Sequence, residues 1–448
     1  MKATKNSEAA RDNEGALLTI ELVPIGDIHP DPQNARAHSK AQIRKIARSI
    51  ERFEFNTPLL VDRDLKIISG HGRWEACQLL CRTTVPVIRL EHLTPEQARA
   101  FAIAENRLVE LSTWDEEALA IHFKALAELD LDFSLEDTGF SMGEIDLFIE
   151  GADATNGDSD AADALPPIGP AVCRPGDLWI LGNHKVLCGD ALEVESYRTL
   201  LDTDRVAAVF TDPPYNVAIN GHVSGKGKRQ HREFAMATGE KSGPEFVIFL
   251  TKACEHAAAF SEDGAVHFVC MDWRHLGELL AAGRQAYDEL LNIAVWTKNN
   301  GGMGSLYRSA HEFVFVFRHG RAAHRNNVQL GRFGRNRTNV WNYPGANTFL
   351  RSAEDADLMA QHPTPKPVAM VADALLDVTA RGDLVLDAFL GSGSTLMAAE
   401  RIGRRCRGIE LDPLYVDLTI RRWQRYTGDT AILAGTGERF DDLTEGRQ

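Results

Sequence analysis

The chain has 448 residues, of which 64 are acidic and 49 are basic, so its formal net charge is −15. This length predicts two or three domains, and 44% hydrophobic with 25% charged residues is typical of a folded protein that needs no disulfide or metal to hold its core. The acidic balance excludes a nucleic-acid-binding surface spread over the whole chain, although local basic segments remain compatible with one.

The seven cysteines form no Cys-x-x-Cys pair and no histidine cluster accompanies them, so the sequence predicts free thiols and no metal site. No apolar run approaches the roughly 20 residues of a membrane span. Residues 1–16 are polar, lack the apolar core of a signal peptide and are expected to form a disordered tail. We therefore expect a cytoplasmic protein with no membrane partner.

The apolar pattern of residues 17–150 predicts a small α+β domain with a helical extension. Apolar residues recur at helical spacing over 40–53, as expected of an amphipathic helix that covers a sheet. The other predicted elements, in chain order, are a strand at 17–25, a hairpin at 57–70 with its turn at 62–65, a helix from Arg73, a strand at 84–90 and helices from 95 to about 148.

Residues 151–170 are acidic, small and rich in Pro and Gly, which predicts a linker. Residues 171–448 form a second predicted domain in which apolar strands alternate with helices, a pattern that predicts a doubly wound, Rossmann-like α/β sheet. Its predicted elements include a hairpin at 177–190, buried strands at 206–210, 264–271, 290–298, 311–320, 384–386 and 406–412, and helices at 244–260 and from about Thr395.

Two motifs in the second domain follow predicted strands. The first is Asp387-Ala-Phe-Leu-Gly391-Ser-Gly393-Ser-Thr395, a glycine-rich turn that leads into a helix. Glycines allow a sharp turn and a close approach of backbone amides to a ligand, and Glu410, at the end of the next strand, could accept hydrogen bonds from ribose hydroxyls. By itself such a turn is compatible with a nucleoside cofactor or with a purely structural role.

The second motif is the tetrad Asp212-Pro213-Pro214-Tyr215, which follows the buried run 206–210. Consecutive prolines stiffen the backbone and donate no amide hydrogen, so the loop presents a carboxylate, a free carbonyl and an aromatic ring together. A planar base with an exocyclic amine requires that set, because its amine donates two hydrogens and its ring stacks. An ordinary rigid turn is the alternative.

With these motifs in this order, residues 172–448 resemble the amino-methyltransferase family of DNA methyltransferases in its permuted beta class. Further matching segments are Leu187-Cys-Gly-Asp190, the pattern Trp296-x-Lys298 followed by His311-Glu312, and His362 to Val368. The resemblance implies S-adenosylmethionine as cofactor, double-stranded DNA as substrate, Asp212, Pro213, Pro214 and Tyr215 as catalytic residues, and a target-recognition region within 298–361. The implied cofactor residues are Asp387, Phe389, Gly391, Gly393, Ser394, Thr395, Glu410, Asp190, Thr364 and Lys366.

The resemblance implies direct methyl transfer to the amine of a flipped base, with adenine as the expected target because Asp at the first tetrad position is commoner among adenine enzymes. Cytosine 4-amino transfer, and transfer to RNA or to a protein glutamine, remain alternatives. A C5-cytosine enzyme would need a nucleophilic cysteine, usually in a Pro-Cys pair, and no cysteine here follows a proline.

Two basic segments interrupt the acidic chain and suggest a confined site for a polyanion. Between Lys298 and Leu350 there are eight basic residues and one acidic residue, Glu312. The expected DNA contacts are Lys226, Lys228, Arg229, Arg232, Lys298, Arg308, Arg332, Arg335 and Arg337.

The first domain carries Gly70-His71-Gly72-Arg73 at a strand-to-helix turn and Ala104-Glu-Asn-Arg107 further on. These segments resemble the ParB/sulfiredoxin-like domain, which implies a phosphate or nucleotide pocket at residues 70–73. This chain has His71 and Gly72 where ParB usually has Glu and Arg, so an accessory or DNA-contacting domain stays open. A ParB-like DNA-binding protein with a vestigial methyltransferase module is the alternative for the whole chain, and the oligomeric state is open, a homodimer included.

Overall fold

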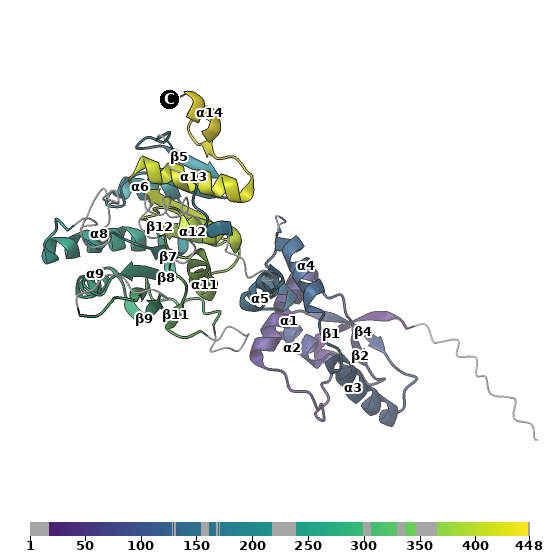
Figure 1. Cartoon of the computed structure of the whole chain (residues 1–448). Helices are drawn as coiled ribbons and strands as arrows, with labels where there is room; N and C mark the ends of the chain where they lie inside the picture. The colour runs from purple at the N-terminus through teal and green to yellow at the C-terminus, as the bar shows by residue number, and fades with distance from the viewer. Residues whose placement is uncertain are drawn as a thin grey trace, which may run out of the picture. The chain divides into compact units, whose positions relative to one another are not determined.

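The structure is a computed structural model that describes residues 18–127, 129, 131–153, 161–166, 169, 171–216, 239–298, 306–328, 337–345 and 365–446. The chain divides into two compact units, Met1–Ser141 and Met142–Gln448, and each is considered by itself (Figure 1). The predicted tail over 1–16 lies outside the described residues. Across the part of the chain that is described, no helix is both long and apolar enough to cross a bilayer.

The first unit contains a four-stranded sheet in the order β1-β4-β2-β3, covered by helices. β2 and β3 form the hairpin that the sequence predicts, and β4 pairs in parallel with β2 and antiparallel with β1. The predicted amphipathic helix buries Ile43, Ala47 and Ile50 in the core of this unit. The elements are β1 (Ile20–Pro24), η1 (Ile25–Asp27), α1 (Lys40–Phe53), β2 (Leu59–Val61), β3 (Ile67–Ser69), α2 (His71–Leu79), β4 (Thr84–Arg89), α3 (Pro95–Glu110), α4 (Glu116–Ala127) and η2 (Leu135–Thr138).

The second unit is built on a ten-stranded sheet in the order β11-β9-β10-β8-β7-β12-β13-β6-β5-β14. Its elements are α5 (Met142–Asp153), η3 (Ala161–Asp163), β5 (Leu178–Leu181), β6 (His184–Cys188), α6 (Val194–Leu201), β7 (Val206–Thr211), α8 (Gly243–Ala259), β8 (Ser261–Met271), α9 (Leu276–Ala286), β9 (Glu289–Thr297), β10 (His311–Arg318), β11 (Val340–Asn342), α11 (Val368–Val378), β12 (Leu384–Asp387), α12 (Ser394–Arg401), β13 (Arg405–Glu410), α13 (Pro413–Thr427), β14 (Ile432–Leu433) and α14 (Phe440–Gly446).

The sheet is parallel at its centre and mixed towards its ends, where β11 pairs in parallel with β9. β8, β7, β12, β13 and β6 run side by side in the same direction, whereas β10 runs antiparallel to both β8 and β9. This arrangement confirms the predicted doubly wound α/β sheet preceded by a small α+β domain.

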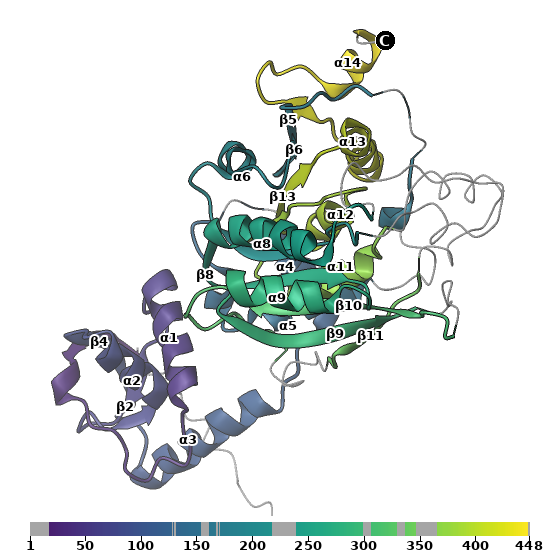
Figure 2. The same cartoon turned by 90° about the vertical axis from the view of Figure 1, so that its left-hand side faces the viewer.

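Helices cover both faces of the sheet (Figure 2). Successive residues of a strand point to opposite faces, so each strand contributes side chains to both layers of helices. Along β8, Phe268 and Cys270 pack in the cluster that contains α11, α12 and α13, while Val269 and Met271 pack with α8 and α9. Both faces are therefore buried, which explains why the central strands read as continuous apolar runs rather than alternating ones.

The boundary between the units falls at 141/142, before the segment 151–170 that the sequence suggests as a linker. α5, predicted as part of the first domain, belongs to the second unit because the buried carboxylate of Asp146 pairs with the buried guanidinium of Arg404 (2.8 and 3.0 Å). Within 151–170, Ala162 is fully buried and its carbonyl accepts hydrogen bonds from Arg422. The predicted linker is therefore packed at Ala162, a small apolar residue that lies against α13.

Candidate active site

The predicted catalytic and cofactor motifs meet at one edge of the second sheet. The parallel strands β6, β7, β12 and β13 end there and are followed by Asp190, Asp212 and the glycine-rich turn, with Glu410 as the last residue of β13. Because β10 runs antiparallel to β8 and β9, its first residues reach the same edge as Lys298, which follows β9. The edge is where ligands bind in open α/β sheets.

The glycine-rich turn needs left-handed backbone at two positions. Gly391 has φ +55° and Gly393 has φ +83°, a region that side-chain-bearing residues rarely adopt. A Cβ at Gly393 would lie 2.7 Å from the side chain of Thr419, whereas a Cβ at Gly391 would meet no described atom closer than the Phe389 carbonyl oxygen at 4.0 Å. The turn is thus tightly packed behind Gly393 and open beside Gly391.

Asp387 connects this turn to the end of β7, which precedes the tetrad. Its Oδ1 accepts hydrogen bonds from the Thr211 hydroxyl (2.9 Å) and the Phe389 amide (3.1 Å), and its Oδ2 accepts one from the Thr395 hydroxyl (2.7 Å). Burial raises the pKa of Asp387 to about 6, and these three donors oppose the rise. The contacts of Asp387 and Thr395 fix the shape of the turn, and their predicted contact with a cofactor stays a prediction.

Glu410 fixes the other side of the turn. Its Oε2 accepts a hydrogen bond from the Gly391 amide and its Oε1 one from the Asp412 amide, both at 2.8 Å. Burial raises the pKa of Glu410 to about 7 despite these two amide donors. The Gly189 amide donates to the Glu410 carbonyl (2.9 Å), so Asp190, the next residue, follows β6 close to Glu410.

The remaining predicted cofactor residues lie around the same turn or outside the described residues. Phe389 is half-buried and its ring centroid lies 5.9 Å from that of Phe249. Ser394 begins α12 and is buried, with its hydroxyl 3.5 Å from the Arg422 guanidinium. Thr364 lies outside the described residues, so its predicted role stays a prediction.

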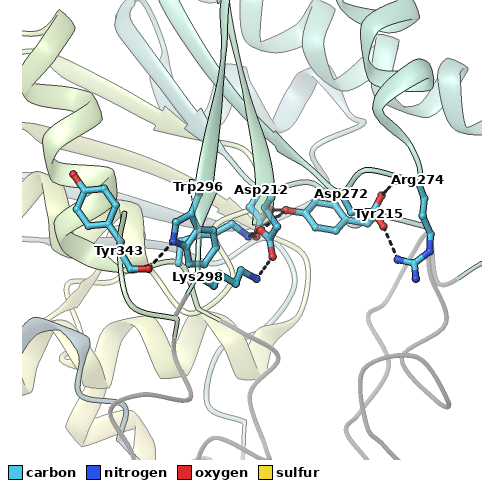
Figure 3. A network of polar contacts seen from close by, with 9 residues as sticks. Asp212, Tyr215, Asp272, Arg274, Trp296, Lys298 and Tyr343 are labelled. Carbon is cyan, nitrogen blue, oxygen red and sulfur yellow. Dashed lines mark hydrogen bonds and ion pairs between the residues drawn. The ribbon is translucent and has the colours of Figure 1, made fainter. Parts of the chain in front are cut away.

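The tetrad carries a network of polar contacts (Figure 3). The Tyr215 hydroxyl donates to Asp212 Oδ1 (2.6 Å) and lies 3.1 Å from Glu312 Oε2, while the Lys366 ammonium donates to Asp212 Oδ2 and to the Tyr215 hydroxyl (3.2 Å). Burial raises the pKa of the Tyr215 phenol well above its usual range, and the charges of Asp212 and Glu312 add to that rise.

Glu312 lies between two lysines. Its Oε1 accepts a hydrogen bond from the Lys298 ammonium, and its Oε2 lies 3.1 Å from the Lys366 ammonium. Burial acts to raise the pKa of Glu312, but Lys366 and Lys298 outweigh it and lower that pKa to about 2. Burial acts to lower the pKa of Lys366, but Asp212 and Glu312 raise it above its usual range.

Both lysines make contacts that the sequence does not predict, and their predicted contacts with DNA and cofactor stay predictions. The sequence predicts that Lys298 binds DNA, yet it pairs with Glu312 and its ammonium lies 4.4 Å from the centre of the Trp296 ring. The sequence predicts a cofactor contact for Lys366, and in the structure its ammonium donates to the Asp212 carboxylate. Both differences arise because the sheet brings together segments that lie far apart along the chain.

An exposed aromatic turn follows β8 beside the tetrad. Trp273 is 53% exposed and the Arg274 guanidinium lies 4.9 Å from its ring centre. Asp272 holds the turn, because its carboxylate accepts hydrogen bonds from the Arg274 and His275 amides and from the Arg274 guanidinium, each at 3.1 Å. Val269 of β8 pairs with Thr211 immediately before the tetrad, and Figure 3 includes the Asp272–Arg274 pair.

Other basic residues expected to bind DNA divide into three groups. Arg308 is exposed and follows Tyr307, which is 85% exposed, just before β10. Arg337 is half-buried and forms ion pairs with Asp377 (2.7 Å) and Asp373 (3.1 Å), which favours a structural role. The residues outside the described part of the chain are Lys226, Lys228, Arg229, Arg232, Arg332 and Arg335, and their role stays a prediction.

In the first unit, the predicted phosphate turn lies beside a cavity of about 620 Å³. His71 lines this cavity, and its Nε2 accepts a hydrogen bond from the Asp31 amide (3.1 Å). Gly70 has φ +105° and precedes α2, Gly72 is buried, and Arg73 lies with its guanidinium 3.5 Å from the Pro58 carbonyl oxygen. Three further cationic side chains line the cavity, namely Arg36, Arg99 and Arg107.

Sequence reasoning gave no role to Trp273 or Arg274 and placed Glu312 only within a matching pattern. An exposed Trp-Arg pair directly after a buried strand is a signal that could have identified the turn. Glu312 carried a weaker signal, because it is the one acidic residue of the basic stretch from Lys298 to Leu350.

Three segments of the chain match family models. Residues 206–421 match the DNA methylase model, residues 8–107 the ParB N-terminal domain, and residues 117–175 the ParB-methyltransferase HTH domain. The last match covers α4 and α5, which the sequence predicts only as a helical extension. The methylase family includes enzymes that act on adenine N6 and enzymes that act on cytosine N4.

Over 80 residues the chain is 41% identical to the ParB-like nuclease domain-containing protein YnaK of Escherichia coli (strain K12), covering 18% of this chain and 92% of YnaK. Over 203 residues it is 29% identical to the putative methylase YubD of the same organism, covering 45% of this chain and 75% of YubD. A solved structure of a putative DNA modification methylase from Thermus thermophilus aligns with 55% of this chain and 95% of its own, at 21% identity and a TM-score of 0.38. The chain therefore carries a DNA methylase domain of the N6/N4 family at residues 206–421 and, as the YnaK match also shows, a ParB-like domain at its N-terminus.

Proposed function

We propose that this protein transfers a methyl group from S-adenosylmethionine to the 6-amino group of adenine in double-stranded DNA, at a specific site. The observation that carries the proposal is the pairing of β7 with β12, which places Asp212 beside the glycine-rich turn, with the Thr211–Asp387 hydrogen bond (2.9 Å) between them. Methyl transfer requires the cofactor and the acceptor base to lie next to each other. A loop that binds the base amine and a turn that binds a nucleoside meet this requirement when they follow adjacent strands.

The residues around the turn fit the cofactor. The open side of Gly391 lets a ligand approach the backbone, and Glu410 lies directly behind it with a carboxylate suited to the ribose hydroxyls. The start of α12, at Ser394, would favour the cofactor's carboxylate, because the amides of a helix start attract negative charge. Asp190 would accept a hydrogen bond from the adenine. When bound, S-adenosylmethionine supplies a methyl group on a positively charged sulfur.

The tetrad would activate the acceptor. The amine lone pair of adenine is delocalised into the ring, so the amine is a poor nucleophile. Hydrogen bonds from the amine to the Asp212 carboxylate and the Pro213 carbonyl would localise that pair and stabilise the developing positive charge. Tyr215 would stack on the extruded base, at an unstacking cost of a few kcal/mol for the duplex.

The experiment that tests the proposal is incubation of the full chain with DNA and a cofactor labelled in its methyl group, followed by digestion to nucleosides. Label in 6-methyladenine is expected, and Asp212→Ala should abolish it. Label only in 4-methylcytosine would reject adenine and leave the coarser DNA methylase assignment intact. Activity that persists unchanged in Asp212→Ala would remove the tetrad from catalysis and favour the vestigial-module alternative.

Methylome sequencing of a host that expresses the chain gives the site. It reports the modified base, the surrounding sequence and the strand pattern together. A DNA duplex that contains this methylation site is then the substrate for the kinetic measurements.

A second candidate activity concerns the first unit. The cavity beside His71 is lined by Arg36, Arg99 and Arg107 and is large enough for a nucleotide, so we propose that it binds one. Glu110 pairs with Arg36 (2.7 Å) and Arg107 (3.2 Å) and reduces the positive charge available to a phosphate. Calorimetric titration with CTP and with ATP tests this, and Arg99→Ala should weaken any binding. The absence of heat with both nucleotides in the parent would reject it.

A further inference from the structure

The ammonium of Lys366 contacts three groups of the network around the tetrad. It donates to Asp212 Oδ2, lies 3.2 Å from the Tyr215 hydroxyl and lies 3.1 Å from Glu312 Oε2. Its side chain is only 7% exposed. An ammonium has three N–H donors, so these three contacts satisfy it.

Asp212 is fully engaged in this arrangement. Its Oδ1 accepts a hydrogen bond from Tyr215 (2.6 Å) and its Oδ2 one from Lys366. An amine that approaches Asp212 therefore meets a carboxylate that already carries two donors, one of them a full positive charge. That charge opposes the positive charge that develops on the amine during methyl transfer.

Glu312 offers Lys366 a second carboxylate within reach. Its Oε2 already faces the Lys366 ammonium, while its Oε1 is held by Lys298, which in turn lies over the Trp296 ring at 4.4 Å. Moving the Lys366 ammonium away from Asp212 towards Glu312 therefore leaves the lysine with one of its two ion pairs, the one to Glu312. Glu312 itself stays in place, because Lys298 anchors it.

We propose that Lys366 occupies the position of the target amine on Asp212 in the absence of DNA, and that the incoming amine displaces its ammonium onto Glu312. Lys366 and Glu312 are then positioning residues for the acceptor. This inference rests on the proposed function, and it assigns Lys366 to the acceptor side of the site, whereas the sequence suggests a cofactor contact.

The test uses the full chain and a duplex that contains the methylation site, with KM for DNA, KM for S-adenosylmethionine and kcat measured separately. Glu312→Gln removes the charge that receives the lysine, so Lys366 stays on Asp212 and KM for DNA should rise by about tenfold or more. Adding Lys366→Met to that variant removes the competing ammonium while keeping the chain length, and should restore KM for DNA towards the parent value. Suppression of one defect by a second substitution is what a merely structural lysine would not produce.

A fluorescent base analogue at the target position gives a second readout. Its emission rises when the base leaves the stack, so Glu312→Gln should reduce the rise and the double variant should recover it. Lys252→Met is the matched control, because Lys252 lies on α8, pairs with Glu193 (3.7 Å) and should leave all three constants unchanged. If Glu312→Gln does not fold, Glu312→Asp draws the carboxylate back by one methylene and carries the same comparison.

A double variant whose KM for DNA is no better than that of Glu312→Gln overturns the displacement. So does a Lys366→Met variant whose defect lies in KM for S-adenosylmethionine, because Lys366 would then be a cofactor ligand. If the parent methylates no DNA at all, the proposed function fails, and the inference fails with it. If the parent methylates and suppression is absent, only the inference fails.

Discussion

Two carboxyl groups at the edge of the second sheet ionise close to neutral pH. Burial raises the pKa of Glu410 to about 7 and that of Asp387 to about 6. A carboxyl whose pKa is raised by folding favours the folded state when it is protonated. The contribution of Glu410 to the free energy of unfolding therefore falls as pH rises from its ordinary pKa of 4.5 to about 7.

Cofactor binding should depend on pH in the opposite direction. The ribose hydroxyls would donate to an ionised Glu410, so KM for S-adenosylmethionine should rise as pH falls through about 7, by up to about tenfold per pH unit. Glu410→Gln should bind more weakly at pH 8 and lose this dependence. The measurement is KM for the cofactor from pH 6 to pH 8.5. If the unsubstituted protein showed the same KM for the cofactor across that range, Glu410 would not be a ligand of the ribose.

The turn after β8 gives a second prediction about single residues. Trp273 is half-exposed beside the tetrad with Arg274 over its ring, an arrangement suited to stacking against a base next to a phosphate. Trp273→Ala should raise KM for DNA, by an amount that corresponds to about 1–3 kcal/mol. KM for the cofactor and the melting temperature should not change.

Ile248→Ala is the control for Trp273→Ala, because Ile248 is also an exposed apolar residue, on α8. We expect it to leave KM for DNA unchanged. Equal effects of the two substitutions would mean that Trp273 has no specific contact with DNA.

At this scale the sequence predicts residue types better than contacts. Asp212 and Tyr215 lie together as predicted, because the tetrad is local in sequence. The pairing of Lys298 and Lys366 with Glu312 is not local: it depends on the register that pairs Trp296 with Glu312 and on the end of β7 reaching the same edge. No pattern in one sequence specifies that register.

The start of α12 shows how an element shapes the site. Gly391 and Gly393 both have left-handed backbone, but only the second is closely packed. Gly393→Ala places a Cβ 2.7 Å from the Thr419 side chain and should lower the free energy of unfolding by about 1–3 kcal/mol. Thermal or urea unfolding measures this loss.

Gly391→Ala provides the matched comparison. Its Cβ would face open space, so we expect a smaller loss of stability than for Gly393→Ala and a larger rise in KM for S-adenosylmethionine. If both substitutions reduced stability equally and left cofactor binding intact, the turn would be structural only.

At the scale of elements, the apolar segments with a clear pattern were predictable, whereas the short strands β11 and β14 were not. The predicted buried strands and the helix after the glycine-rich turn are present as β7 to β10, β12, β13 and α12. β11 has three residues and β14 has two, too few to show a period, and both are placed by pairing with a neighbouring strand. Tertiary pairing, rather than local sequence preference, defines such strands.

A buried ion pair lies near the beginning of the second unit. Asp146 of α5 holds Arg404 through two hydrogen bonds and also lies 3.2 Å from Arg381. Removing one member of a buried pair leaves an uncompensated charge, so Asp146→Ala should reduce the free energy of unfolding of this unit by about 3–5 kcal/mol. Differential scanning calorimetry checks this on the full chain.

The exposed pair Glu195–Arg198 is the control for Asp146→Ala, since both its members are more than half exposed. Glu195→Ala should change the same transition by no more than about 0.5 kcal/mol. A similar small effect of Asp146→Ala would show that water reaches Arg404 and that α5 is loosely attached.

The Asp146–Arg404 pair also constrains how the two parts of this chain could have been joined. A recombination event that separated α5 from the methylase would leave Arg404 buried without a partner, and selection would remove most such products. Viable exchanges of the ParB-like module should therefore fall before Met142. Since one family model covers α4 and α5 together, both helices would be inherited with the methylase, and the exchange points should lie before α4.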